Sequence, residues 1–526
     1  MLTDRISFAV SAINTRTLGK GEEKDGSPRQ RGGLCLPASP KKSGMVAQAP
    51  CPTAGWTGPE QPRLRLYSRA VPGTRPYRSS EAPLEHADEI IHARWLLPVE
   101  PADAVLEDHA LAIRDGRILG IARSAEAAAL WQAPVERRLG RHLLMPGLVN
   151  AHCHAAMTLL RGLADDHALM EWLQDWIWPA EGRFVGEDFV RTGTRLAIAE
   201  MLRSGTTCFS DMYFFPDVAA EAVIETGIRA QIAFPILEHP TAWARTADEY
   251  LSKGLHVRDR FKSNPRLGFA FGPHAPYTNS DATLARVAVL AAELDSPVQI
   301  HLHETAGEVA DSISAHGLRP IQRLERLGLL SPRLQAVHMT QISPADRELL
   351  LRERASVVHC PSSNLKLASG FCPTRDLLAA GVNVCIGTDG AASNNTLDMF
   401  AEARLAALVA KGGSGDPTAL SAHAALRLAT LAGAEALGLG DRIGSLLPGK
   451  DADMIAVDLD RLGCQPVYDV HSALVYTAGA HAVTHNWVEG RLLVEEGQLL
   501  QQDEPSLLAA ARDWRVRIHG STRGAH

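Results

Sequence analysis

The chain has 526 residues, of which 45% are hydrophobic and 21% are charged, and its formal net charge is −7. This length is enough to bury a large core and to form more than one folded unit. The acidic balance argues against a large basic surface for nucleic acid, and no run of about 18 apolar residues predicts a membrane span. We therefore expect a small-molecule partner, no nucleic acid and no membrane; whether the chain forms a homo-oligomer is left open.

Residues 1–82 are rich in Gly, Pro, Ser and Arg, as in Gly26 to Gly33, and have neither helical nor strand periodicity. A segment without regularly spaced apolar residues cannot build a core, so we expect a disordered N-terminal extension. The eight cysteines are scattered along the chain without a C-x-x-C pair. This usage is typical of a reducing compartment and indicates a cytoplasmic protein.

Sequence typical of a folded domain begins near Ala87. Ile90 to Leu97, Ala110 to Ile113 and Arg117 to Ile121 are predicted to be short strands, with a tight turn at Asp115-Gly116 between the last two. An antiparallel β unit is therefore expected before the main domain.

From Gly147 onward, apolar runs alternate with amphipathic stretches such as Asp188 to Leu202, Asp281 to Leu294 and Pro320 to Leu327. This alternation is the pattern of repeated βα units. Eight runs are predicted to be strands: Gly147 to His152, Thr206 to Met212, Arg229 to Leu237, Leu267 to Gly272, Pro297 to His303, Gln335 to Met339, Ala355 to His359 and Val382 to Gly387. They predict an α/β fold, a (β/α)8 barrel of the TIM type over residues 146–440, with its chemistry at the carboxyl ends of the strands.

The βα alternation ends near Gly440. The following sequence is interpreted as strands and turns: Ile443 to Asp458, Val470 to Tyr476, Ala482 to Val488 and Arg491 to Val494. We expect residues 87–145 and 441–500 to pair as a small composite β-sandwich. Residues 501–526 are predicted to form a C-terminal helix and tail, because Pro505 to Ile518 has helical periodicity.

Polar residues stand at the carboxyl ends of the predicted strands. His152 and His154 come first, and residues two apart in a strand point to the same side, so both imidazoles can reach one ion. Later strand ends carry Asp211, His274, His301, Glu304, His338, His359 and Asp389. Imidazoles with a carboxylate suit Zn²⁺ or Fe²⁺ and leave a position for water, as in catalytic metal sites.

Several motifs resemble the amidohydrolase superfamily, in the order in which that family has them: Pro146-Gly147-x-x-Asn150-x-His152-x-His154, His301-x-His303-Glu304-Thr305, Val337-His338, Gly387-Thr388-Asp389-Gly390-Ala391 and Pro448-Gly449-Lys450-x-Ala452-Asp453. The resemblance is to the deaminase and chlorohydrolase branch, and most to its 5′-methylthioadenosine/S-adenosylhomocysteine deaminases. It covers roughly residues 87–496.

The resemblance implies the role of each site residue. The implied ligands of one divalent metal, Zn²⁺ or Fe²⁺, are His152, His154, His301 and Asp389. The implied catalytic residues are Glu304 as proton shuttle, His338 as the group that polarises the attacking water, and Asp389. The implied substrate contacts are Glu181, His274, Trp172, Glu304 and Asp389. His303 is expected to face away from the metal, into the barrel wall.

The reaction implied by the resemblance is hydrolytic deamination of adenine nucleosides: 5′-methylthioadenosine, S-adenosylhomocysteine and adenosine. Two alternative reactions on the same site are hydrolysis of amino- or chloro-s-triazines and deamination of a base of the guanine type. A barrel that has lost its metal would be no enzyme, and the complete ligand set argues against it.

A chain that begins at Pro83 is expected to fold and to remain active, because residues 1–82 lack apolar periodicity and precede the resemblance. The melting temperature and kcat of the shortened chain are compared with those of the full chain. A large drop in either would mean that the N-terminal segment contributes to the folded enzyme.

Overall fold

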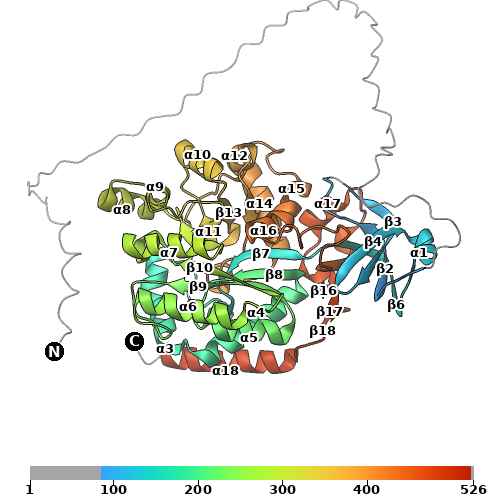
Figure 1. Ribbon diagram of the computed structural model, residues 1–526, viewed down its shortest axis with the longest axis horizontal. Helices are drawn as coiled ribbons and strands as arrows, with labels where there is room; N and C mark the ends of the chain where they lie inside the picture. The colour runs from blue at the N-terminus through green and yellow to red at the C-terminus, as the bar shows by residue number, and fades with distance from the viewer. Residues whose placement is uncertain (1–83, 103, 523–526) are drawn as a thin grey trace, which may run out of the picture. The chain divides into compact units, whose positions relative to one another are not determined.

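The computed structural model describes residues 84–102 and 104–522, so the expectation of disorder for residues 1–82 lies outside the described residues. A parallel eight-stranded sheet forms the centre of the described part, with helices on its outside (Figure 1). Its strands follow one another in chain order: β7 (Leu148–Cys153), β8 (Thr206–Asp211), β9 (Arg229–Ile236), β10 (Leu267–Pro273), β11 (Val298–Leu302), β12 (Leu334–His338), β13 (Ser356–His359) and β14 (Val384–Ile386). All eight predicted strands are confirmed, and so is the barrel.

The first and last strands of the barrel meet through the segments that carry predicted ligands. The backbone N–H of Asp389 donates to the carbonyl of His152 at 3.0 Å, and Thr388 N–H donates to the side-chain oxygen of Asn150 at 3.0 Å. A Cβ on Gly387 would lie 2.7 Å from the backbone N and O of His152. Only glycine therefore allows the two strands to approach this closely.

Helices between the strands bury one apolar face on the barrel. The longer ones are α4 (Glu187–Arg203), α5 (Pro216–Thr226), α6 (Ala247–Phe261), α7 (Asp281–Glu293), α8 (Ala306–His316), α9 (Pro320–Arg326), α10 (Pro344–Glu353), α14 (Met399–Ser414) and α15 (Ala422–Leu428). In α7, Ser280 caps the N-terminus by accepting from Thr283 N–H, and Leu284 and Val287 are buried. The three predicted helices α4, α7 and α9 are confirmed.

Both ends of the described chain build one further sheet, in the order β18-β17-β16-β15-β6-β2-β3-β4. Its strands are β2 (Glu89–Leu96), β3 (Leu106–Arg114), β4 (Arg117–Arg123), β6 (Val135–Pro146), β15 (Met454–Asp458), β16 (Val483–Val488), β17 (Arg491–Glu495) and β18 (Gln498–Leu499). The N- and C-terminal parts join where β6 pairs with β15. Trp487 of β16 donates to Glu89 of β2 at 3.2 Å although these strands are not neighbours, so the sheet curves over its own core.

Two local predictions were incomplete or wrong. Val470 to Tyr476 is helical, not a strand: it forms α17 (Val470–Ser472) and the turn η5 (Ala473–Thr477), because Asp469 caps it by accepting from Ser472 N–H at 2.7 Å. Strand β6 was not foreseen, since its first half is charged; Arg137 there pairs with Glu89 and Glu495.

A buried ion pair connects the composite sheet to the barrel. Arg229, at the start of β9, is 1% exposed and lies 3.0 Å from Asp451 and 2.8 Å from Asp453. Both aspartates belong to the Pro448-Gly449-Lys450-Asp451-Ala452-Asp453 motif, which therefore has a structural use. Removal of one partner would leave a buried charge unpaired.

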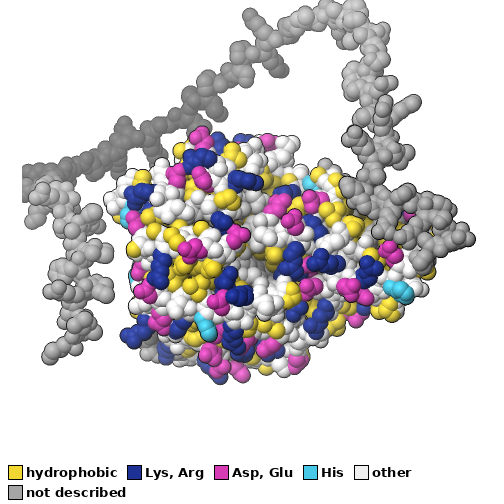
Figure 2. Space-filling model, in the orientation of Figure 1, with side chains coloured by type: hydrophobic (Ala, Val, Ile, Leu, Met, Phe, Trp, Pro, Cys, Tyr) yellow, Lys and Arg dark blue, Asp and Glu magenta, His cyan; other side chains and the backbone are white. Residues whose placement is uncertain are grey.

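The C-terminal helix α18 (Glu504–Thr522) lies outside the barrel against α4, as expected, with Trp514 packed 5.3 Å from Phe189. Basic and acidic side chains are interspersed over the face of the described part seen in Figure 2. Among the described residues, no helix is long and apolar enough to cross a membrane.

Candidate metal centre and substrate pocket

Four predicted ligands converge at the carboxyl ends of β7, β11 and β14. One ligand atom from each of His152, His154, His301 and Asp389 lies within 4.8 Å of the others. Nε2 of His301 is 3.2 Å from Nε2 of His152, and Nε2 of His154 is 3.2 Å from Oδ1 of Asp389. Two ligand atoms held about 2.0–2.1 Å from one tetrahedral ion are about 3.3 Å apart. The donor set therefore fits one divalent metal ion.

The other ring nitrogen of each histidine in this set has an oxygen partner. The Nδ1 partners are the side chain of Gln299 for His152 at 2.8 Å, the carbonyl of Met212 for His154 at 2.6 Å and the carbonyl of His274 for His301 at 2.7 Å. An oxygen acceptor places the proton on Nδ1 and leaves the Nε2 lone pair free to bind a metal. Burial, together with neighbouring His274, lowers the pKa of His301 well below its usual value, which favours the neutral ligand form.

The carboxylate of Asp389 is fixed by hydroxyl groups. Ser363 and Ser393 donate to its Oδ2 at 2.6 and 2.8 Å, and Gly390 N–H donates to Oδ1 at 2.8 Å. Burial acts to raise the pKa of Asp389, but bonding to His152 and His154 outweighs it, so the pKa lies well below the usual value. Asp389 is therefore a charged ligand, and it adopts φ +60°, an uncommon backbone conformation for a residue with a side chain.

Glu304 and His338 lie beside the four predicted metal ligands. Oε2 of Glu304 is 3.7 Å from Nε2 of His338, whose Nδ1 is 2.8 Å from the side-chain oxygen of Asn364. Burial, and then the charge of Asp389, raise the pKa of Glu304 to about 8. A carboxyl group with this pKa holds a proton at neutral pH and can donate it.

A second glutamate, which the sequence reasoning missed, holds the backbone around Glu304. Glu308, in the first turn of α8, accepts from the N–H of His303 at 3.0 Å and from the N–H of Glu304 at 2.7 Å. The His303 ring contacts the carbonyl of Gln341 and the N–H of Ile321, and so faces away from the metal ligands as predicted. The signal for Glu308 was present, because Thr305-x-x-Glu308 has the spacing of a capping box.

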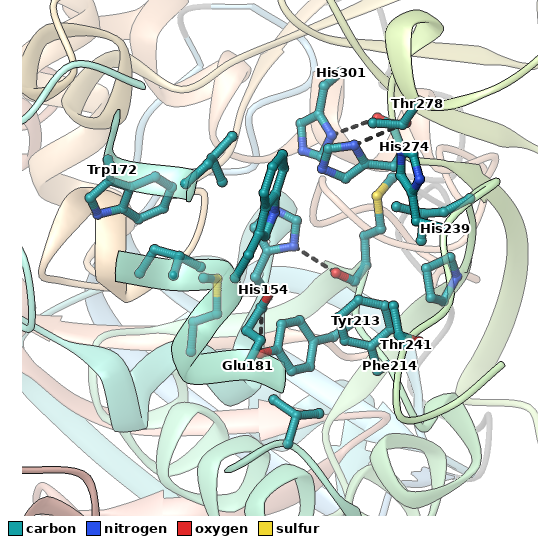
Figure 3. A pocket seen from close by; sticks show the side chains of 18 of the residues that line it. His154, Trp172, Glu181, Tyr213, Phe214, His239, Thr241, His274, Thr278 and His301 are labelled. Atoms are coloured by element: carbon teal, nitrogen blue, oxygen red, sulfur yellow. Dashed lines mark hydrogen bonds between the residues drawn. The ribbon is translucent and has the colours of Figure 1, made fainter. Parts of the chain in front are cut away.

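The four predicted metal ligands adjoin a cavity of about 440 Å³. Seven predicted site residues besides Glu304 line it or lie at its floor: His154, Trp172, Glu181, His274, His301, His338 and Asp389. His152 is fully buried beneath them. Figure 3 shows Trp172 on one side of the cavity and His239 with Thr241 on the other, with His154 between them. The structure thus brings together all the residues to which the resemblance assigned a role.

Glu181 and His274 place two partly buried polar groups on the cavity wall. Glu181, from α3 (Trp178–Phe184), accepts from the hydroxyl of Tyr213 at 2.7 Å, and burial raises its pKa to about 7. Burial and the nearby His154 lower the pKa of His274 to about 3, so its ring is neutral. Tyr213, two residues beyond β8, was missed because its position past the strand end is set by the loop.

Asp211 and His359, two strand-end residues to which no role was assigned, support loops. Asp211 accepts from the N–H of Ala155 at 2.7 Å and fixes the turn after His154. His359 Nδ1 is 3.3 Å from the side-chain nitrogen of Asn364, the residue that also contacts His338.

Residues 143–493 match the Amidohydrolase family. The chain belongs to this family. A 5-methylthioadenosine/S-adenosylhomocysteine deaminase of Saccharophagus degradans is 52% identical to this amidohydrolase over 432 residues, which are 82% of this chain and 97% of the relative.

Solved structures agree with the barrel. A zinc-bound adenosine deaminase of Xanthomonas campestris superimposes with a TM-score of 0.82 at 51% identity, and the match covers 83% of this amidohydrolase and all of that chain. Atrazine chlorohydrolase of Arthrobacter aurescens, complexed with zinc, has a TM-score of 0.76 at 23% identity over 81% of this chain and 99% of its own. At that identity the second likeness supports the fold alone.

Replacement of His152, His154, His301 or Asp389 by Ala is expected to reduce bound metal and to abolish turnover, because each change removes one donor of the set. Metal content per chain and kcat are measured on the same preparation. His256→Ala, at an exposed position of α6, is the matched control and should keep both. Full metal content and normal kcat in two of the four variants would contradict the ligand assignment.

Glu308→Ala is expected to lower kcat by about tenfold or more with little change in metal content, because two backbone N–H groups next to Glu304 lose their acceptor. Glu308→Gln keeps one acceptor oxygen and should recover part of the activity. Equal kcat in Glu308→Ala and the parent enzyme would show that Glu304 is positioned without this carboxylate.

Proposed function

We propose that this amidohydrolase is a metal-dependent deaminase of adenine nucleosides, acting on 5′-methylthioadenosine, S-adenosylhomocysteine and adenosine. The position of Glu304, next to His338 and beside the four-donor group, carries this proposal. The names of the relatives from S. degradans and X. campestris, each more than 50% identical, support the same reaction. The zinc in the X. campestris structure favours Zn²⁺ as the native metal, although the donors also suit Fe²⁺.

The geometry fits hydrolysis at C6 of adenine. A divalent ion bound by these four side chains would lower the pKa of water from about 15.7 to about 7 and so supply a nucleophile at neutral pH. Asp389 accepts a proton from the water, and Glu304 donates its proton to the ring nitrogen N1 as the oxygen attacks C6. Asp389 then passes the water proton to the amino group, which leaves as ammonia, and the C6 hydroxyl proton returns to Glu304, so that the base becomes hypoxanthine. Nε2 of His338, which lies 3.7 Å from Oε2 of Glu304, accepts a hydrogen bond from the attacking water and helps to hold and polarise it.

The polar groups of the cavity wall fit a nucleoside. Glu181 and His274 can hydrogen-bond the ribose hydroxyls, and Trp172 offers an apolar surface near the base. The Trp172 indole N–H has no partner among the described residues, and Figure 3 shows this nitrogen turned away from His154. We therefore assign Trp172 a packing contact with the substrate.

The compartment proposed for the enzyme is the cytoplasm. All six cysteines that lie in the described part of the chain are free and buried. Free thiols persist in a reducing environment, which supports this localisation.

Ammonia release from adenosine, 5′-methylthioadenosine, S-adenosylhomocysteine, guanine and melamine tests the proposed reaction. We expect ammonia from the nucleosides. Ammonia from melamine or guanine alone, or chloride from a chlorinated s-triazine, would replace the proposal with one of its alternatives. No product from any of these compounds would contradict the deaminase assignment.

Glu304→Gln tests proton transfer separately from metal binding. Gln keeps the size of the side chain but cannot carry the proton, a step that general acid–base catalysis accelerates by about 10²–10⁴-fold. We expect kcat to fall by about 10² or more while metal content and binding of a non-reactive nucleoside analogue are kept. A kcat within a few-fold of the parent would mean that the proton reaches N1 by another route.

A further inference from the structure

The cavity has a polar floor and an apolar outer wall. We call the four predicted metal ligands, together with Glu304 and His338, the floor of the cavity. We call the apolar lining formed by Leu169, Leu173, Ile177, Trp178, Leu237 and Pro240 the outer wall. None of the side chains that line the cavity in the described part of the chain is a lysine or an arginine, and the acidic ones are Glu181, Glu304 and Asp389.

The floor fixes the direction of a bound nucleoside. In adenosine the reacting carbon C6 and the nitrogen N9, which carries the ribose, lie at opposite ends of the purine. With C6 at the floor, the ribose is higher in the cavity and its 5′ substituent points toward the mouth. Trp178 and Tyr277, which are 40% and 44% exposed, mark this mouth. The outer wall is therefore the surface that meets the 5′ substituent.

We infer that the outer wall selects an uncharged 5′ substituent, so that this enzyme prefers 5′-methylthioadenosine to S-adenosylhomocysteine. The inference rests on the proposed deaminase function. A methylthio group can bury its apolar surface against the wall. The homocysteine group adds a carboxylate and an ammonium, which would lose hydration without gaining charged partners there.

Two basic side chains close to lining residues have other partners. Lys253 lies 2.7 Å from Glu249 and also bonds the carbonyl of Trp243. The Arg183 guanidinium lies over the ring of its neighbour Phe184, 5.4 Å from the ring centre. His239 does line the mouth, but an imidazole lacks the two-pronged geometry with which Arg binds a carboxylate.

The direct test measures kcat/KM of the full-length, metal-loaded enzyme for 5′-methylthioadenosine, adenosine and S-adenosylhomocysteine by ammonia release. We expect the value for 5′-methylthioadenosine to exceed that for S-adenosylhomocysteine by about 10–100-fold, the effect of one missing charge-assisted contact. Equal values, or a preference for S-adenosylhomocysteine, would overturn the inference and leave the deaminase function standing. Absence of ammonia from all three nucleosides would overturn both.

A second measurement adds the missing cation. Ala242 is exposed and lines the mouth, so Ala242→Arg places a guanidinium there without disturbing the core. The ratio of kcat/KM for S-adenosylhomocysteine to that for 5′-methylthioadenosine should rise by about tenfold. Ala242→Gln, a long polar side chain without charge, should leave the ratio near that of the parent. An unchanged ratio with Arg, or an equal rise with Gln, would overturn the inference.

Discussion

Closure of the barrel between β14 and β7 is the constraint on which the site depends. The hydrogen bond from Asp389 N–H to the His152 carbonyl joins the last strand to the first, and Gly387 permits the approach. Ligands separated by more than 230 residues in the sequence thereby become neighbours. Because His301 comes from the opposite part of the sheet order, its position depends on the same closure, and a shift of one strand would separate the donors.

Burial makes the carboxyl groups of the cavity chemically different from one another. Burial raises the pKa of Glu181 to about 7 and that of Glu304 to about 8, and outweighs the nearby charge of His154 in both cases. Asp389 is also buried, but its bonds with His152 and His154 keep its pKa far below the usual value. One cavity therefore contains a charged carboxylate suited to bind a cation and a neutral carboxyl group suited to donate a proton. The charge on Asp389 also helps to keep the proton on Glu304.

The barrel and its ligands could be predicted because they follow from residue periodicity and motif spacing. Apolar runs of strand length that end in His or Asp indicate both the strand and the direction of its last side chain. The helix at Val470–Ser472 was mistaken for a strand, because a short apolar run fits both the strand period and the helical period. The N-terminal cap by Asp469 favours the helix. Tyr213 was missed because its position depends on the loop after β8, which periodicity does not encode. Glu308 was missed although its spacing from Thr305 is that of a capping box.

The backbone strain at the strand ends could not be predicted from the sequence either. His303, His338 and Asp389 all have positive φ, at 52°, 76° and 60°. Such conformations cost about 1–3 kcal/mol each and persist only where surrounding contacts determine them. Here those contacts are the bonds of Glu308 to the His303 backbone, of Asn364 to His338 and of two serines to Asp389. Two of these residues, His338 and Asp389, line the cavity, and the third, His303, directly precedes Glu304. The outer wall of the cavity takes no part in these bonds, so its side chains can change the accepted 5′ substituent without disturbing the chemistry at the floor.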